Sequence, residues 1–506
     1  MASNSAFKAY AQDHGGRVIV LFLLFLLALY EFYSSGFSSF AIICILPILV
    51  LGVIVSFRYR MLLFWVLFGI NYLVMWHNIR IGIPASLPNE MLEIMLIAIA
   101  LIVVEDYPFK RIGNVMFVTL AIWCGYCTLE ILNNTCGLGI NINAWYQGVR
   151  LMAFQLMYAF IVYTLYITKP KILINYLYVW GCFALFAVFW IWKQKYVGLG
   201  NLENSWLQGP GRTTHIIQGG TLIRYFSVYS DAANFGVGIA STAIAFIIIG
   251  ITSKLKVLRY FCLIVGFACV WGMFPSGTRT GIVCLGAGLG FYIFLSKSIK
   301  IIIPFSIVFG LAAFLLVFTT IGNGNSQIRR MRSAFDKNDA STAVRTINQE
   351  TMRKYMKEAP WGIGLGMFGT NVPANNKYRL MSTIAADSEY VFIWLRTGKI
   401  GITTFLILTA IMFIGACWIV FFTLKSPSLR GIGAGLCCAF VSQQLGAYGN
   451  MVLMQFPNCL IIYGGLTIVY ILPHIEQEWI AYENGILEKT AEKKRLKLEK
   501  KRASRV

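Results

Sequence analysis

Long apolar runs separated by short polar connections dominate the sequence. Runs such as 40–57, 115–131, 172–192 and 301–320 approach or exceed the ~20 residues that a helix needs to cross the ~30 Å hydrocarbon core of a bilayer. Counting such runs predicts about fourteen spans, and therefore an all-α, polytopic transmembrane helical bundle. The predicted spans are 18–35, 38–56, 61–78, 90–105, 113–133, 149–168, 172–193, 232–251, 257–275, 279–296, 299–321, 400–423, 430–449 and 455–473. No small-residue cleavage site follows the first span, so we interpret it as a permanent helix and not as a secretory signal.

Alternate connections between these spans are basic, and this bias predicts the orientation of the chain. The basic connections contain Arg58/Arg60, Lys110/Arg111, Lys169/Lys171, Lys254/Lys256/Arg259, Lys297/Lys300 and Lys425/Arg430. Because Lys and Arg favour cytoplasmic loops, we expect these connections and both termini in the cytoplasm. The chain then divides into a transmembrane bundle, 1–473, and a basic cytoplasmic tail, 474–506. Two large loops lie on the outer side, 194–231 and 322–399, and we call the second one the cap.

The composition agrees with this topology and adds a charge argument. With 58% hydrophobic and only 13% charged residues, the chain cannot be a water-soluble domain. The cap holds twelve Lys and Arg against six Asp and Glu, and a basic outer surface indicates an anionic ligand. The tail is rich in Lys and Arg, so we expect a charged helix on the anionic inner leaflet and no nucleic-acid binding.

Cysteine and histidine do not indicate a metal or redox site. The twelve cysteines lie almost all within predicted spans, where Cys124 and Cys127 are either a redox pair or small apolar packing residues. Packing is the favoured interpretation, because cysteine behaves as a small hydrophobe in such surroundings. The four histidines are scattered without the spacing of a metal site, and we expect no metal and no cofactor.

Two arginines are predicted at the outer ends of helices. Arg224 precedes the span 232–251, and Arg279 lies in PSGTRTG at the next outer junction. A guanidinium group presents a planar fork of donors that matches the geometry of phosphate oxygens. Its charge is unfavourable near hydrocarbon, so an arginine there usually has an ionic partner or a functional role. The tight turn at 275–277 would also open a helix start toward an anion. Snorkelling of both side chains to the membrane interface is the alternative.

The cap contains a predicted amphipathic helix over 341–358. Its apolar positions are Val344, Ile347, Met352 and Met356. Arg345 on this helix is placed to reach a phosphate, and the helix ends at Pro360. The following GIGLG at 362–366 predicts a sharp, glycine-rich re-entry turn, because no parallel-sheet context exists for a dinucleotide motif.

Two carboxylates, Asp387 and Glu389, precede the apolar segment that leads into the span 400–423. Such groups can accept a proton from a sugar hydroxyl or bind a sugar by hydrogen bonds. They can equally cap the start of a helix, where the dipole stabilises acids. The sequence leaves these alternatives open.

The order of these motifs resembles that of the O-antigen ligase and polymerase superfamily of bacterial membrane glycosyltransferases. The pattern comprises Arg224 with Asn-Phe-Gly at 234–236, Ser-x-x-Arg at 276–279, Arg345, Pro-x-Gly-x-Gly-x-x-x-Phe at 360–368, the polar pair, and Gly398 and Gly401. The resemblance covers roughly 200–423 and implies a GT-C-type bundle in the bacterial inner membrane, with its active site facing the periplasm.

The resemblance also implies substrates and roles. The donor would be a glycan on undecaprenyl diphosphate, and the acceptor a sugar hydroxyl on a second lipid-linked unit. Arg279 and Arg345 would bind the diphosphate with help from Arg224, Arg279 would stabilise the charge that develops on it, and Asp387 or Glu389 would orient or deprotonate the acceptor. Membrane lipids and a chain-length regulator are the expected partners.

One departure from the family pattern favours a polymerase of O-antigen or capsule repeat units. The ligases, which transfer O-antigen to the lipid A core, typically have histidine followed by Asn or Ser where this chain has Asp387 and Ser388. His215 does not occupy that position. The ligase remains an alternative. A lipid-linked oligosaccharide flippase or another transporter is a second one, less favoured because we find no repeated halves and few charges within spans.

Overall fold

The computed structural model describes residues 57–76, 86–217, 222–296 and 340–503, with scattered positions in 16–30 and 303–332. Side chains within the helical stretches 340–344 and 493–503 are not described. The chain divides into two compact units, Met1–Val66 and Leu67–Val506. The smaller unit includes the first residues of helix α4, and the larger unit contains the elements that position the candidate site.

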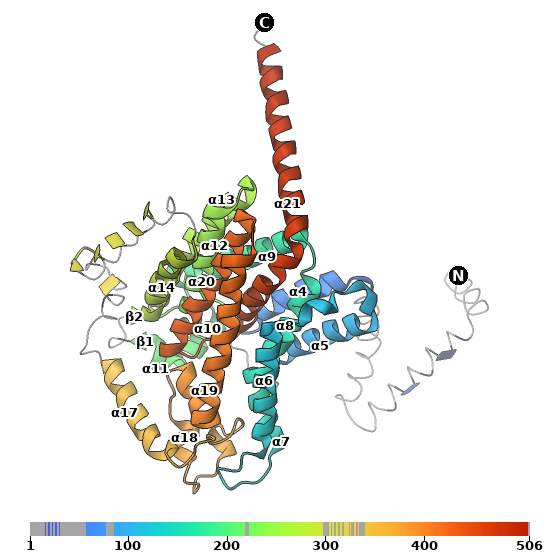
Figure 1. The fold of residues 1–506 in the computed structure, drawn as a ribbon. Helices are drawn as coiled ribbons and strands as arrows, with labels where there is room; N and C mark the ends of the chain where they lie inside the picture. The colour runs from blue at the N-terminus through green and yellow to red at the C-terminus, as the bar shows by residue number, and fades with distance from the viewer. Residues whose placement is uncertain are drawn as a thin grey trace, which may run out of the picture. The chain divides into compact units, whose positions relative to one another are not determined.

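Helices make up most of the described structure (Figure 1). The long helices are α4 (Arg60–Leu73), α5 (Leu87–Ile102), α6 (Val115–Leu129), α8 (Gln155–Tyr166), α9 (Pro170–Tyr196), α12 (Ala232–Thr252), α13 (Lys256–Met273), α14 (Arg279–Leu295), α17 (Ala340–Met356), α19 (Glu389–Trp418), α20 (Pro427–Gly449) and α21 (Asn458–Ala503). Shorter elements are α7 (Ile142–Val149), α10 (Asn201–Gln208), α11 (Arg212–His215), α18 (Arg379–Thr383), the π-helical turns η5 (Arg150–Phe154) and η10 (Ile419–Thr423), and the 3-10 turns η2 (Val104–Asp106), η3 (Phe109–Ile112), η4 (Glu130–Leu132), η7 (Phe274–Ser276) and η9 (Gly369–Asn371). Two short strands, β1 (Ile216–Ile217) and β2 (Leu222–Ile223), form an antiparallel pair in which Ile216 faces Ile223.

The prediction of a helical membrane protein is confirmed. Seven segments of the described chain are long and apolar enough to cross a membrane. They are Val115–Leu132, Ile142–Tyr166, Pro170–Tyr196, Ala232–Thr252, Lys256–Ser276, Glu389–Thr423 and Asn458–Glu492. The predicted spans 18–35, 38–56 and 299–321 lie wholly or largely outside the described residues, and each of the other predicted spans coincides with a helix.

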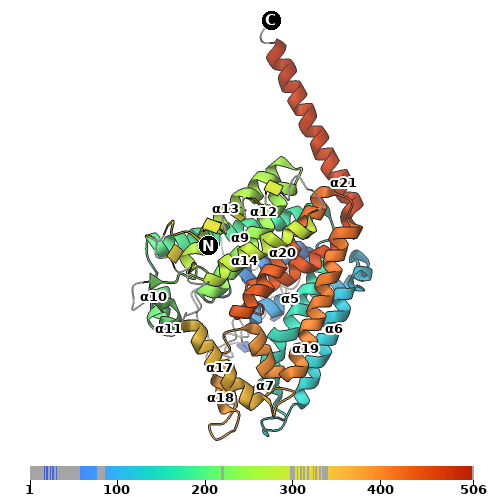
Figure 2. The same ribbon diagram turned by 60° about the vertical axis from the view of Figure 1, so that its left-hand side comes forward.

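Helix α12 lies at the centre of the larger unit and packs against α13, α14 and α20 (Figure 2). Nearly all of its side chains are buried, as expected for a helix that is apolar on every face. Small residues permit close contact between these helices. At Gly435 of α20, for example, a Cβ atom would lie 2.9 Å from the carbonyl oxygen of Ala245 on α12. This tight group of helices fixes the relative positions of their outer ends.

Helix α19 begins earlier than the predicted span 400–423 and bends at Gly398, where φ is 68°. At this bend the backbone of the predicted re-entry turn lies directly against the helix. A Cβ atom on Gly398 would lie 2.0 Å from the Pro360 carbonyl oxygen, and one on Gly362 would lie 2.4 Å from the Arg396 backbone. The predicted sharp turn is present, because Gly362 and Gly364 both adopt positive φ.

The described part of the cap has an apolar core of its own. Met352 and Met356 of α17 are buried there beside Cys136, Ile363 and Leu395. Helix α17 therefore packs through the methionines that the amphipathic pattern indicated. Its first apolar positions differ: Ile347 is 63% exposed, and the side chain of Val344 lies outside the described ones.

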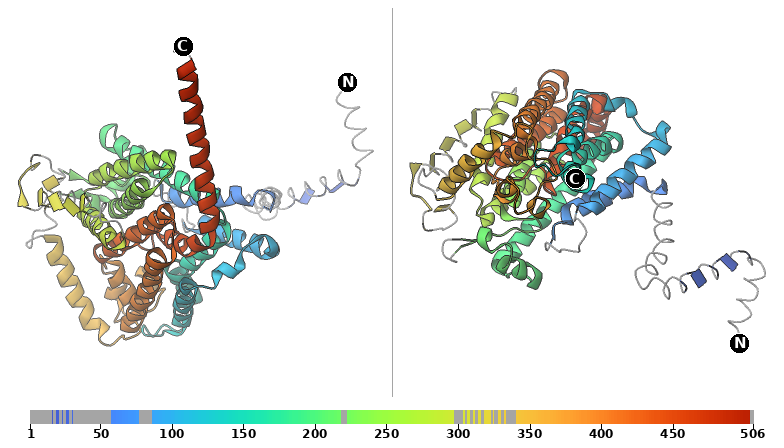
Figure 3. Two further views of the ribbon diagram at one scale, coloured as in Figure 1. Left: turned by 45° about the horizontal axis from the view of Figure 1, so that its top comes forward. Right: turned by 90° about the horizontal axis from the view of Figure 1, so that it is seen from below.

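The predicted tail does not begin with a break at residue 474. Helix α21 is 46 residues long and runs through the last predicted span and into the tail, with Pro473 inside it. Its C-terminal half projects away from the other helices of its unit (Figures 1 and 3). The start of the tail therefore has the same direction as the preceding span.

Candidate functional site

Arg224 connects the loop 194–231 to the junction between α13 and α14. Its Nη1 donates to the Thr214 carbonyl oxygen at 3.0 Å, and its Nη2 donates to Thr278 Oγ1 at 3.1 Å. Its Nε donates to the Ser276 carbonyl oxygen at 3.4 Å. The guanidinium group is thus held in one place by three acceptors, which is the arrangement of a positioned side chain and not of one that snorkels freely.

The three predicted arginines share one electrostatic environment. Burial lowers the pKa of Arg224, the charge of Asp231 raises it, and the charges of Arg279 and Arg345 lower it further. This effect requires the guanidinium groups of Arg279 and Arg345 each to lie within electrostatic range of Arg224, although the three residues come from distant parts of the chain. Such a group of like charges favours the binding of an anion.

The turn before Arg279 has the tight geometry that PSGTRTG predicted. Gly277 adopts the left-handed conformation with φ 58°, and Ser276 Oγ donates to the Met273 carbonyl oxygen at 2.6 Å. Thr278 Oγ1 donates to the Ala232 carbonyl oxygen at 2.6 Å. Gly236 permits this contact, because a Cβ atom there would lie 2.6 Å from Ser276 Oγ. The start of α14, which carries Arg279, is therefore fixed against the start of α12.

Arg345 reaches the same region from the cap. Its Nη2 donates to the Gly449 carbonyl oxygen at 3.0 Å, at the C-terminal end of α20. The next residue, Asn450, donates through Nδ2 to Thr280 Oγ1 at 2.8 Å, and Thr280 follows Arg279 directly. The end of α20 thus links the cap arginine to the start of α14.

The two predicted carboxylates have different surroundings. Asp387 is partly exposed, and its φ of 53° is uncommon for a residue other than glycine. Its neighbour Ser388 donates to the Ala447 carbonyl oxygen at 3.1 Å, again in the last turn of α20. Glu389 is only 1% exposed, and its Oε2 accepts from the backbone N–H of Leu453 at 2.9 Å. The Asp387 side chain is therefore more exposed than that of Glu389, which accepts a hydrogen bond from the connection between α20 and α21.

The sequence analysis did not foresee the contribution of His215. Its Nε2 accepts the N–H of Ala232 at 3.0 Å, and its Nδ1 lies 2.8 Å from Thr214 Oγ1. A ring nitrogen that accepts a backbone N–H is deprotonated, so the other nitrogen carries the hydrogen. Burial lowers the pKa of His215 to about 4, and the charge of Arg224 acts in the same direction. A neutral histidine thus caps α12 directly beside Arg224.

The connection between α20 and α21 supplies further polar groups that were missed. Ser230 Oγ donates to Gln455 Oε1 at 2.6 Å, and Asn234 Nδ2 donates to the Phe456 carbonyl oxygen at 2.9 Å. Asn458 Nδ2 in turn donates to the Asn234 carbonyl oxygen at 2.9 Å. The signal that could have found them is the polar interruption YGNMVLMQFPN at 448–458 between two apolar spans.

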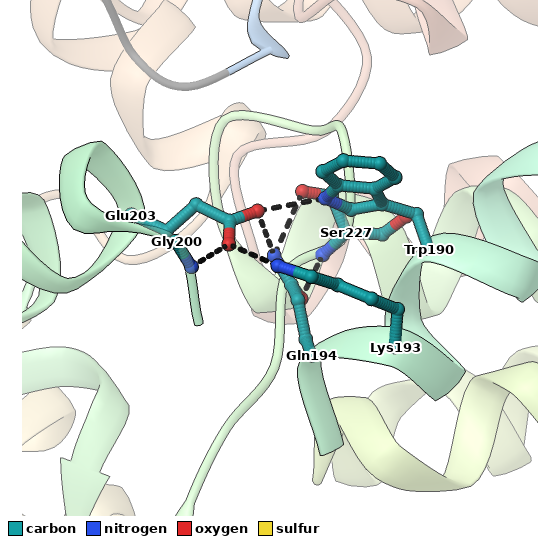
Figure 4. A network of polar contacts seen from close by, with 6 residues as sticks. All are labelled: Trp190, Lys193, Gln194, Gly200, Glu203 and Ser227. Carbon is teal, nitrogen blue, oxygen red and sulfur yellow. Dashed lines mark hydrogen bonds and ion pairs between the residues drawn. The ribbon is translucent and has the colours of Figure 1, made fainter. Parts of the chain in front are cut away.

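A network around Glu203 holds the loop that carries Arg224 (Figure 4). Glu203 Oε1 accepts from Trp190 Nε1 at 2.7 Å and from Gln194 Nε2 at 2.8 Å, and Gln194 Oε1 accepts the N–H of Ser227 at 2.8 Å. Burial raises the pKa of Glu203, but hydrogen bonds from Gly200, Gln194 and Trp190 outweigh it, so the pKa lies below its ordinary value. An ionised carboxylate whose oxygens all accept hydrogen bonds has a structural role. Through Gln194 it holds Ser227, which lies three residues after Arg224 in the chain.

A comparison with known families agrees with this arrangement. Residues 264–406 match the family described as O-antigen ligase. The match contains Arg279, Arg345, Asp387 and Glu389, whereas Arg224 precedes it. No curated protein matches the chain. The match supports the O-antigen ligase and polymerase superfamily that the order of motifs indicated.

Proposed function

We propose, from the match of residues 264–406 to the family described as O-antigen ligase, that the chain polymerises lipid-linked oligosaccharide repeat units into a surface polysaccharide. Its function is of the ligase or polymerase type, with lipid-linked glycans as substrates, and it is a membrane protein. The observation that carries the finer proposal is the shared environment of Arg224, Arg279 and Arg345 at the start of α14. Three fixed guanidinium groups are suited to a diphosphate.

The proposed reaction is a direct transfer of the glycan. The acceptor hydroxyl oxygen forms a bond to the anomeric carbon of the donor, while the bond from that carbon to the diphosphate oxygen breaks and the oxygen keeps the electron pair. The hydroxyl proton passes to a carboxylate. The negative charge that develops on the leaving diphosphate is stabilised by Arg279 and Arg345, with Arg224 assisting, so these side chains take the place of a divalent cation.

Asp387 is the better candidate for the group that receives the proton. It is partly exposed, and Ser388 anchors its segment beside the carbonyl that Arg345 contacts. Glu389 is buried and accepts a backbone N–H, which suits a residue that positions the connection 450–457 around the site. The strained backbone of Asp387 supports this assignment, because unusual φ values often occur at functional sites.

A polymerase is favoured over a ligase by the Asp387-Ser388 pair, which stands where ligases of the family have histidine. The two functions differ in their acceptor. Purified lipid A core should be glycosylated by a ligase and ignored by a polymerase, which should instead extend a second lipid-linked repeat unit. Transfer to lipid A core with no extension of repeat units would contradict the proposal.

The orientation proposed from the basic connections places this chemistry at the outer face of a bacterial inner membrane, with both termini in the cytoplasm. The donor is undecaprenyl diphosphate whose glycan has already crossed the membrane. A chain-length regulator is a natural partner for a polymerase. These assignments rest on the distribution of Lys and Arg and on the superfamily.

The test uses the purified protein in vesicles, with lipid-linked repeat units supplied on the face that corresponds to the outside. The expected result is a ladder of glycans, which transport alone cannot produce. Arg279→Ala should lower the rate of elongation about 10²–10³-fold, because a fixed donor to the developing charge is removed. Arg353→Ala is the matched control, since Arg353 is exposed on α17. Wild-type ladders from a folded Arg279→Ala protein would refute the central role of Arg279.

A further inference from the structure

A second group of polar side chains is buried between α5 and the start of α8. It consists of Asn89, Glu90 and Glu93 on α5, Arg150 on η5 and Gln155 at the start of α8. Their exposed fractions are 0, 2, 0, 7 and 1%, in that order. Groups buried this deeply are shielded from solvent, so their charges and hydrogen bonds have to be satisfied within the cluster.

The hydrogen bonds of this cluster leave it with an excess of negative charge. Gln155 Nε2 donates to both oxygens of Glu93, at 2.7 and 2.8 Å. Arg150 Nη2 donates to Ser86 Oγ at 2.8 Å, and Arg150 Nη1 lies 3.6 Å from Glu90 Oε1. Arg150 is thus paired with Glu90 and not with Glu93, and the cluster holds two carboxyl groups but only one guanidinium group. Glu93 is surrounded only by the neutral amides of Gln155 and Asn89, although a buried carboxylate without a paired charge is strongly unfavourable.

Several acceptors in the cluster also have no donor. Glu90 Oε1, Gln155 Oε1 and Asn89 Oδ1 accept no hydrogen bond, although all three are buried. The Asn89 side chain lies beside the Glu93 carboxyl group. A buried acceptor without a donor costs about 1–3 kcal/mol. Two donors of the cluster, Asn89 Nδ2 and Arg150 Nε, are also unpaired. A water molecule satisfies unpaired donors and acceptors, but only a positively charged species also compensates the negative charge of the cluster.

The backbone brings these groups together by a local irregularity. Arg150 begins the π-helical turn η5, and Gln155 follows it. In a regular α-helix, residues five apart point in different directions, whereas the wider π-helical turn brings both side chains toward α5. Such turns occur frequently at functional sites. According to the predicted orientation, the start of α5 and η5 both lie at the outer side of the membrane.

We propose that Asn89, Glu90, Glu93, Arg150 and Gln155 form a binding site for one monovalent cation, either a proton shared by the carboxyl groups or an ion of the size of sodium. The other titratable groups that face the two carboxyl groups are Tyr158 and Tyr163 on α8 and Cys459 on α21. This proposal does not depend on the proposed function.

The cation site lies close to the proposed catalytic region. Cys459, near the start of α21, is within electrostatic range of both Glu93 and Glu389. Glu389 in turn holds the connection 450–457 through Leu453. Binding of a positive charge at Glu93 therefore changes the electrostatic field around Cys459, which Glu389 also contributes to.

The test measures the thermal unfolding midpoint of the purified full-length protein at constant ionic strength, with sodium replaced stepwise by choline and with pH varied from 5 to 9. If the species is a metal ion, the midpoint rises with sodium and saturates. If it is a proton, sodium has no effect, and the midpoint of the wild type rises relative to that of Glu93→Gln as the pH falls. Glu105→Gln is the control, because Glu105 is exposed just beyond α5 and its loss should leave both dependences unchanged.

A second measurement does not require the variant to be stable. If a proton is bound, infrared spectra of the wild type at neutral pH in choline should contain the carbonyl stretch of a protonated carboxyl group. This band should weaken in Glu93→Gln. If that variant does not fold, the same comparison is made with Glu90→Gln. The absence of such a band, together with no response of the wild-type midpoint to sodium, would overturn the proposal and indicate that a neutral water molecule fills the cluster.

Discussion

At the scale of single residues, Asp387 carries the sharpest prediction. Asp387→Asn keeps the size and the hydrogen-bonding capacity of the side chain but removes the group that receives the proton. We expect elongation to slow by about 10²–10⁴-fold, while the thermal unfolding midpoint stays that of the wild type. Glu350→Gln is the control, because Glu350 is an exposed carboxylate of the same cap. A normal rate in Asp387→Asn would leave the acceptor without an assigned base.

Glu389 should behave in the opposite way. Its buried carboxylate accepts the N–H of Leu453, so Glu389→Gln replaces one acceptor oxygen by an amide that must face backbone donors. We expect a loss of stability of about 1–3 kcal/mol, seen in thermal unfolding. Elongation measured well below the new midpoint should fall much less than in Asp387→Asn. A loss of rate in a fully stable Glu389→Gln protein would instead assign the catalytic carboxylate to this position.

Because His215 is buried, we predict that the stability of the folded protein depends on pH. Burial lowers its pKa to about 4 in the folded protein, below its ordinary value of 6.5. The unfolded chain therefore binds more protons between these two values, and stability should fall as the pH decreases from 6.5 to 4, by up to about 3 kcal/mol. Above pH 6.5 the histidine is neutral in both states and contributes no dependence. His215→Gln, which can still accept the Ala232 N–H, should lose less stability over this interval, as measured by unfolding at each pH.

At the scale of elements, the bend in α19 joins the cap to the membrane bundle. Gly398 has a positive φ, and a Cβ atom there would lie 2.0 Å from the Pro360 carbonyl oxygen. Gly398→Ala should therefore cost at least ~1–3 kcal/mol of stability and separate the re-entry turn from α19. Limited proteolysis of the cap and thermal unfolding would both detect this change. Gly125→Ala on α6, where a Cβ atom meets nothing within 4 Å, should be neutral.

The elements were predictable as far as local patterns determine them. Length and apolarity located every described span, and the amphipathic pattern of the cap found α17 through Met352 and Met356. The predicted span began only at residue 400, and the sequence left a helix start at the two carboxylates as an open alternative; α19 begins at Glu389, and residues 389–397 pack into the cap. Continuation of α21 beyond residue 473 was missed for a related reason: a change in polarity marks the edge of the membrane, but it does not end a helix.

At the scale of the whole molecule, the candidate residues meet through contacts that carry no signal in the sequence. The carbonyl oxygen of Ala447 accepts a hydrogen bond from Ser388, and that of Gly449 accepts one from Arg345. Every residue type offers such a backbone acceptor, so the sequence does not mark these positions. The resemblance to a family could name Arg224, Arg279, Arg345 and Asp387, but not the backbone contacts that hold their segments near one another. The polar cluster at Glu93 escaped notice because its two glutamates lie in an otherwise apolar run.

The assembled charges also predict how the protein responds to removal of divalent cations. If three guanidinium groups stabilise the leaving diphosphate, excess EDTA should leave elongation at its full rate, because these charges are part of the fold and are not lost on chelation. Added Mg²⁺ or Mn²⁺ should not restore Arg279→Ala, since a free ion lacks the fixed position at the start of α14. Elongation in vesicles, measured with and without EDTA, decides between the two mechanisms. Inhibition by EDTA that Mn²⁺ reverses would assign the diphosphate to a metal ion, and the clustered arginines would then serve only to attract the anionic substrate.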